Sequence, residues 1–142
     1  MRRILLTFVL ALGGCAGSAP KIEVSDAWAR ATSATASSAA VYMTIANQGG
    51  ADRLTAVTTP AAKAAAFHAM TTEGSIMRMR AITDGIEVAA GGSLSLEPNG
   101  THVMLTGLQR PLVPGQQIPA RLRFSRSGYR DIAISVVEAG AR

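Results

Sequence analysis

The chain has 142 residues, of which 48% are hydrophobic and 16% charged, and it contains one cysteine. This length allows one domain around one core, and the composition excludes a chain that is disordered over most of its length. Its 14 Lys and Arg residues outnumber its 9 Asp and Glu residues, but they are scattered and not interleaved with aromatics, so nothing indicates binding to nucleic acid.

The first fifteen residues have the pattern of a secretory signal that ends at a cysteine. Arg2 and Arg3 precede the apolar run Ile4–Leu12, and Gly13-Gly14-Cys15 follows. The run is shorter than the roughly 20 apolar residues that span a bilayer, so it predicts a signal peptide over residues 1–14. Because Leu-Gly-Gly-Cys resembles the bacterial lipobox, we expect Cys15 to be lipidated. An ordinary signal peptide with a free or buried cysteine is the alternative.

Lipidation would tie the mature protein to a membrane of the cell envelope, since several acyl chains on one residue anchor firmly. Ala16, rather than an aspartate, follows the cysteine and favours the outer membrane over the inner one. Residues 15–21 then read as a short tether. Loss of Arg2 and Arg3 reduces 14 basic residues to 12 against 9 acidic ones, a net charge of +3.

From Ile22 onward, short runs of alternating apolar residues are separated by turn residues, which is typical of a β-sandwich or barrel. Pro60–Phe67 is rich in alanine and favours a helix by propensity alone, so its state stays open, and Ala31–Ala40 is expected to be a loop. The domain is predicted over 22–138, with a tail at 139–142. The candidate strands are Ile22–Trp28, Ala40–Ala46, Arg53–Thr58, Ile76–Ile82, Gly85–Ala89, Ser93–Leu96, His102–Leu105, Gln117–Phe124 and Asp131–Val137.

Both histidines occur in the same short pattern, His68-Ala69-Met70 and His102-Val103-Met104, and Met77 and Met79 lie between them. Alternate residues of a strand share one face. His102 and Met104 therefore point together toward a rim or pocket, while Val103 and Leu105 point to the core. The same division applies at His68 and Met70 if that segment is extended.

Imidazole and thioether groups are the donors that suit Cu(I), a soft ion. Zinc prefers thiolates, further histidines or a carboxylate, and calcium and magnesium need several oxygens. A blue-copper centre requires a cysteine thiolate, and the single cysteine lies at the lipid end. Methionine is also a common filler of cores. We therefore assign Met43 and Met77 to the core and leave Met70 open.

The residues His68, Met79, His102 and Met104 resemble the metal motif of the periplasmic copper chaperone family PCuAC. That motif is a His, ten residues, a Met, about twenty-one or twenty-two residues and His-x-Met, and this spacing selects Met79 over Met77. Asp26–Arg30, Ala40–Ile45 and Met104–Leu108 also resemble the family, and the resemblance covers roughly residues 22–138.

The resemblance implies a single-domain, all-β fold, a cupredoxin-like or immunoglobulin-like Greek-key β-sandwich. It also implies an accessible Cu(I) site made by His68, Met79, His102 and Met104. The implied role is delivery of copper to the binuclear copper centre of cytochrome c oxidase, directly or with a partner chaperone. A lipid anchor at Cys15 is a variation, because many members of the family are soluble.

Two other functions stay open. One is scavenging of copper, or resistance to it, by an envelope lipoprotein without an oxidase partner. The other is a structural lipoprotein whose histidines and methionines are incidental. We expect no enzymatic activity, because acidic residues do not cluster around either histidine and no nucleophile–base pair can be named.

Overall fold

The computed structural model describes residues 17–142, so the predicted signal peptide and Cys15 lie outside the described residues. Residues 17–142 form ten strands, and no residue in this range is helical. This part of the chain accordingly offers no helix able to cross a membrane. The strands are β1 (Ile22–Arg30), β2 (Ser38–Asn47), β3 (Asp52–Thr58), β4 (Ala62–Glu73), β5 (Ile76–Ile82), β6 (Ile86–Val88), β7 (Ser93–Leu96), β8 (His102–Leu108), β9 (Gln117–Phe124) and β10 (Gly128–Val137).

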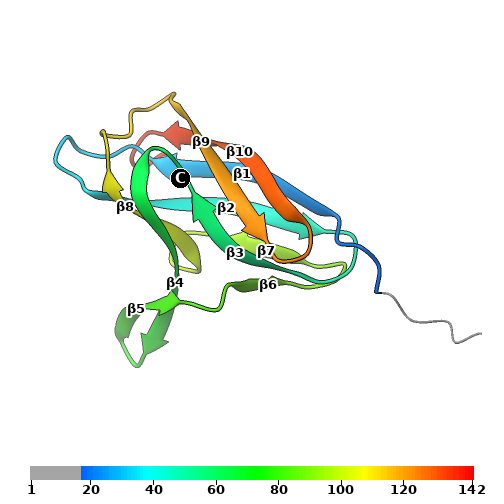
Figure 1. The fold of residues 1–142 in the computed structure, drawn as a ribbon. Coiled ribbons are helices and arrows are strands. Elements are labelled where there is room, and N and C mark those ends of the chain that lie inside the picture. The colour runs from blue at the N-terminus through cyan, green and yellow to red at the C-terminus, as the bar shows by residue number, and fades with distance from the viewer. Residues whose placement is uncertain (1–16) are drawn as a thin grey trace, which may run out of the picture.

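The strands are hydrogen-bonded in the order β5-β4-β8-β2-β1-β10-β9-β3-β6, and β7 pairs with β2. All pairs are antiparallel except β1 with β10. Strand β1 joins the two layers of a sandwich, because its first half pairs with β2 alone and its second half also pairs with β10 (Figure 1). The predicted all-β sandwich is confirmed.

Side chains that alternate along the strands fill the space between the layers. In β9 every second residue is buried, which is the pattern of a strand with one face in the core. Met43 on β2 is 2% exposed, which confirms its assignment to the core. The cluster is continuous across both layers and includes Val41, Ile45, Leu54, Phe67, Val103, Leu105, Ile118, Leu122, Phe124 and Ile134.

The segment left open at Pro60–Phe67 is extended, because β4 begins at Ala62. Strand β4 is hydrogen-bonded to β8 along Ala62–His68 and to β5 along Phe67–Glu73. These pairings outweigh the modest helix preference of a few alanines. The expected loop Ala31–Ala40 is shorter than predicted, since β2 begins at Ser38.

The described part of the predicted tether lies against the sandwich. Lys21 donates its backbone N–H to the buried side chain of Asn47, and Gly50 donates to the carbonyl of Ala19. A Cβ atom on Gly49 would overlap the Ala19 carbonyl oxygen, so this turn requires glycine for the close approach. The chain therefore enters the domain at the end of the sandwich that carries the β2–β3 turn (Figure 1).

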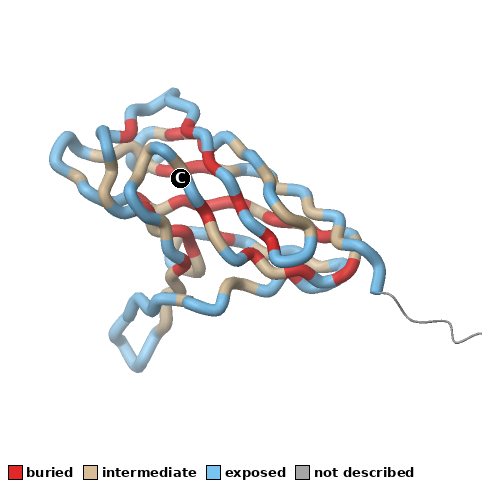
Figure 2. Tube along the Cα trace, in the orientation of Figure 1, coloured by how far each residue is buried: buried red, intermediate tan, exposed pale blue. Residues whose placement is uncertain are grey.

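The hairpin β4–β5 extends beyond the body of the sandwich (Figure 1). Pairing of β4 with β8 ends where His68 lies opposite His102, so residues 69–73 pair only with β5. Most of the hairpin is exposed (Figure 2). Met77 is 51% exposed, and its assignment to the core is wrong, because no second layer covers this part of β5.

Candidate metal centre

Strand register brings the two histidines to one face of the β5-β4-β8-β2 sheet. His68 on β4 lies directly opposite His102 on β8, and their ring centroids are 5.9 Å apart in an edge-to-face arrangement. Val103 and Leu105, which alternate with His102 and Met104 along β8, are fully buried in the core. The predicted alternation along β8, with Val103 and Leu105 on the core face, is therefore confirmed.

His102 is buried, with only 4% of the residue exposed, which excludes the rim among the two predicted locations, a rim or a pocket. Its Nδ1 lies 3.0 Å from the carbonyl oxygen of Gly100. Because a carbonyl only accepts, Nδ1 is the donor, and in the neutral imidazole Nε2 then keeps a free lone pair. Nε2 is buried and has no hydrogen-bond partner among the described residues.

An imidazole held in this way is prepared for a metal. Histidine ligands commonly donate their second ring N–H to a carbonyl, which fixes the tautomer and the orientation of the ring. A buried polar atom without a partner also costs free energy, about 1–3 kcal/mol. An ion bound at Nε2 would remove that cost for His102.

Met79 on β5 joins the site through His68. Its Sδ atom lies 2.8 Å from Nδ1 of His68, although the two residues are eleven positions apart in the chain. Met79 is 48% exposed, so the sulfur reaches the histidine from the solvent side. Met77 shares this face but lies opposite Thr72, one step farther along the hairpin.

Met104 lies on β8 between two alanines, Ala40 on β2 and Ala66 on β4. Both neighbours are small, so the thioether has room above the sheet, and the residue is partly buried. Met70 lies opposite Met79 on the same face. The structure thus brings His68, Met79, His102 and Met104 to one side of the sheet, with Met70 and Met77 beside them.

Two aromatic residues lie next to the donors, and sequence reasoning used them only as marks of family resemblance. The ring of Tyr42 is 6.3 Å from that of His102 and 4.6 Å from that of Trp28. The guanidinium of Arg30 lies over both aromatic rings. Both aromatic residues are buried, and Tyr42 covers one side of His102. Only the pairing of β2 with β8 reveals this contact.

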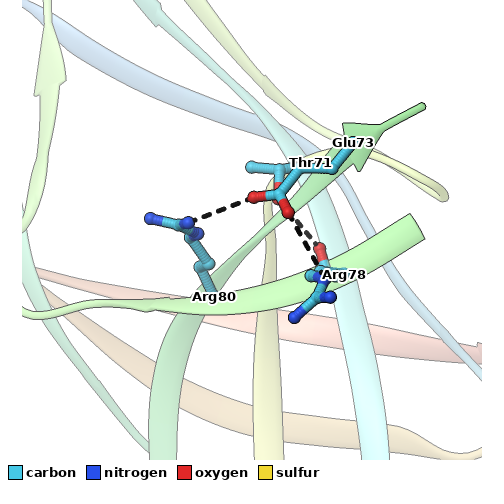
Figure 3. Close-up of polar contacts among 4 residues, drawn as sticks. All are labelled: Thr71, Glu73, Arg78 and Arg80. Atoms are coloured by element: carbon cyan, nitrogen blue, oxygen red, sulfur yellow. Dashed lines mark hydrogen bonds and ion pairs between the residues drawn. The ribbon is translucent and has the colours of Figure 1, made fainter. Parts of the chain in front are cut away.

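The charged groups of the hairpin lie on the face opposite the donors. Glu73 forms ion pairs with Arg78 and Arg80, at 3.5 Å and 3.3 Å, and Thr71 donates to the carbonyl of Arg78 (Figure 3). In the β4–β5 register these residues alternate with Met70, Met77 and Met79. One face of the hairpin is therefore charged and the other carries thioethers.

The donor set is suited to a soft ion. Within residues 17–142, no group of three His, Cys, Asp or Glu residues is placed to hold a metal. Two imidazoles with two thioethers are neutral ligands of the kind that Cu(I) accepts.

Comparison with known proteins places the chain in a family. Residues 22–136 match the family model "Putative lipoprotein LpqE-like". "Putative lipoprotein Lxx21020" of Leifsonia xyli subsp. xyli is 32% identical over 140 residues, which cover 90% of this chain and 83% of that protein.

Solved structures share the fold. The copper-bound PCuAC domain from PmoF2 has a TM-score of 0.71 at 23% identity, covering 84% of this chain and 94% of that domain. The Cu(I) form of DR1885 from Deinococcus radiodurans has a TM-score of 0.65 at 27% identity, covering 89% and 85%. The resemblance to PCuAC proteins is confirmed, and the chain belongs to the LpqE-like family with the fold of a PCuAC domain.

Proposed function

We propose that this protein binds Cu(I) through His68, Met79, His102 and Met104 and passes the ion to an acceptor in the cell envelope. The observation that carries the proposal is the buried Nε2 of His102, which has a free lone pair and no hydrogen-bond partner among the described residues. The copper-bound states of two PCuAC structures support the choice of ion.

The arrangement of donors suits transfer of the ion rather than catalysis. His102 is held by its hydrogen bond to Gly100, while Met79 is half exposed on the protruding hairpin. A ligand of the acceptor would replace Met79 first, and the ion would then leave the buried imidazole last. This order keeps Cu(I) coordinated throughout the exchange, and the protein's part in it is binding and release.

The acceptor implied by the PCuAC resemblance is the binuclear copper centre of cytochrome c oxidase, reached directly or through another copper chaperone. We also propose that Cys15 carries a lipid anchor, which agrees with the lipoprotein names of the family and of the Leifsonia relative. An anchored chaperone would act at a membrane surface facing the periplasm.

A competition titration with a chromogenic Cu(I) chelator tests the site. The mature chain is compared with the variants His68→Ala, Met79→Leu, His102→Ala and Met104→Leu, and Met43→Leu serves as the control that removes a core thioether. Each of the four substitutions is expected to weaken binding and the control to leave it unchanged. Unchanged binding in Met79→Leu and His102→Ala would instead favour a structural lipoprotein.

The same titration at several pH values tests the histidines. A protonated imidazole cannot coordinate a metal, so the affinity for Cu(I) should fall as the solution is made more acidic. An affinity that stays constant down to about pH 4 would show that the histidines are not ligands.

A second candidate, copper scavenging, is favoured by Ala16 after the predicted lipidation site, which indicates an outer-membrane anchor distant from an inner-membrane oxidase. Deletion of the gene distinguishes the two functions. Loss of oxidase activity under low copper supports delivery, whereas sensitivity to copper without that loss supports scavenging.

A further inference from the structure

The methionine face of the β4–β5 hairpin continues past the four proposed ligands. Met70 lies opposite Met79, and Met77 lies opposite Thr72 on the same face. Directly opposed side chains on a sheet have Cβ atoms about 5 Å apart, and diagonal neighbours about 7–8 Å, which is within reach of long side chains. The three thioethers can therefore converge on one ion.

The exposure of these methionines calls for a reason. Met77 and Met79 are about half exposed, on a hairpin whose opposite face is charged and paired (Figure 3). A position that needed only a solvated strand residue would be served by a polar side chain, and methionine is exposed to oxidation at such a position. What these side chains share is a soft sulfur donor.

We infer that Met70, Met77 and Met79 form a second, weaker Cu(I) site through which the ion enters and leaves the His68–His102 site. This inference rests on the proposed function, since it assigns a route to the same ion. Met79 belongs to both sites because its sulfur contacts His68 while its neighbour across the hairpin is Met70. Cu(I) moves between them by exchange of one thioether or imidazole at a time, with no change of oxidation state.

The burial of the donors sets the direction of this path. Exposure falls from Met77, at 51%, to His102, at 4%. An ion arriving from solvent meets thioethers alone and then acquires imidazoles as it approaches the body. Because three neutral thioethers lack the nitrogen donors of the inner site, the outer site should bind more weakly and exchange faster.

The first test isolates the outer site in the full chain with anaerobic Cu(I). The double variant His68→Ala/His102→Ala should retain one Cu(I) per chain, bound more than about 100-fold more weakly than in the unaltered protein. Adding Met70→Leu and Met77→Leu should abolish this residual binding, whereas adding Met43→Leu should not. Absence of residual binding in a folded double variant, or residual binding that survives loss of both methionines, would overturn the inference.

The second test leaves the buried histidines intact, so it does not depend on the folding of the double variant. In Met70→Leu/Met77→Leu, the rate of Cu(I) release to a chelator should fall about tenfold while the equilibrium affinity changes less than twofold. An unchanged release rate would overturn the inference. The two proposals can fail separately. If Cu(I) binding stays tight and depends on His102, but release is not slowed in Met70→Leu/Met77→Leu, the inner site is retained and the outer site is rejected.

Discussion

The two halves of the candidate site are built in different ways. His102 and Met104 lie on β8, a central strand whose alternate residues, Val103 and Leu105, are fully buried. Met79 lies on β5, which is an edge strand of a hairpin outside the body. The first half is fixed by the core, and the second is held mainly by its own strand pairing and by exposed ion pairs.

Under the proposed function, this difference would let one small domain both hold and release an ion. A ligand set by packing is already oriented before binding, so little ordering cost is added when the metal arrives. A ligand on an exposed hairpin can be displaced without disturbing the core. We expect affinity to depend mostly on the body and exchange mostly on the hairpin.

The largest effect is expected for His102→Ala, which removes the proposed ligand that lies in the body of the sandwich. Loss of a partner behind a metal ligand typically costs about 10- to 100-fold in affinity, so loss of the ligand itself should exceed about 100-fold. Chelator competition measures the change, and circular dichroism shows that the variant is folded. An affinity within threefold of the unaltered protein would show that the buried half does not dominate binding.

Asp52→Asn should lower the stability of the sandwich without altering the candidate metal site. Asp52 is 4% exposed and accepts backbone N–H bonds from Arg53, Arg126 and Ser127. Hydrogen bonds to a charged group are worth about 1.5–3 kcal/mol, so we expect a loss of about 2 kcal/mol in the free energy of unfolding at neutral pH. Urea denaturation measures this loss, and Cu(I) affinity serves as the control that should not change.

The pH dependence of stability gives the same residue a second readout. Burial raises the pKa of Asp52, but the hydrogen bonds that it accepts from side-chain and backbone groups outweigh burial and hold the pKa below the ordinary value of 3.8. The stabilisation is therefore complete above the unfolded-state pKa and is lost as the pH falls through the lower folded-state pKa. In Asp52→Asn this acid-sensitive part of the stability should disappear. An unaltered acid profile would exclude Asp52 as its source.

Met79→Leu should have a smaller effect on affinity and a larger one on exchange. The substitution keeps the size of the side chain and removes the sulfur that contacts His68. We expect affinity to fall about tenfold, equivalent to roughly 1.4 kcal/mol, with the stability of the fold unchanged. Met43→Leu, in the core, is the matched control. A loss as large as that of His102→Ala would contradict the assignment of the main binding energy to the body.

Glu73→Gln should have the smallest effect. It breaks two exposed ion pairs with Arg78 and Arg80, and exposed pairs contribute at most about 1 kcal/mol each. Thermal unfolding should shift slightly and Cu(I) affinity should not change, because these groups lie on the face opposite the methionines. A tenfold loss of affinity would show that the two faces of the hairpin are not independent.

The sequence by itself determined the all-β architecture and which side chains of β8 share a face. Both depend on local alternation, since His102-Val103-Met104-Leu105 assigns its own faces in any strand. The spacing of the family motif selected Met79 over Met77, and the contact between Met79 and His68 agrees with that choice.

Only the tertiary structure decided the neighbours of these residues. The pairing of β4 with β8 places His68 opposite His102, and the pairing of β2 with β8 brings Tyr42 beside it. Met43 and Met77 looked equivalent in the sequence, yet one is in the core and the other is exposed. Burial depends on whether a second layer covers the strand, and that contact joins segments far apart in the chain, which local periodicity does not record.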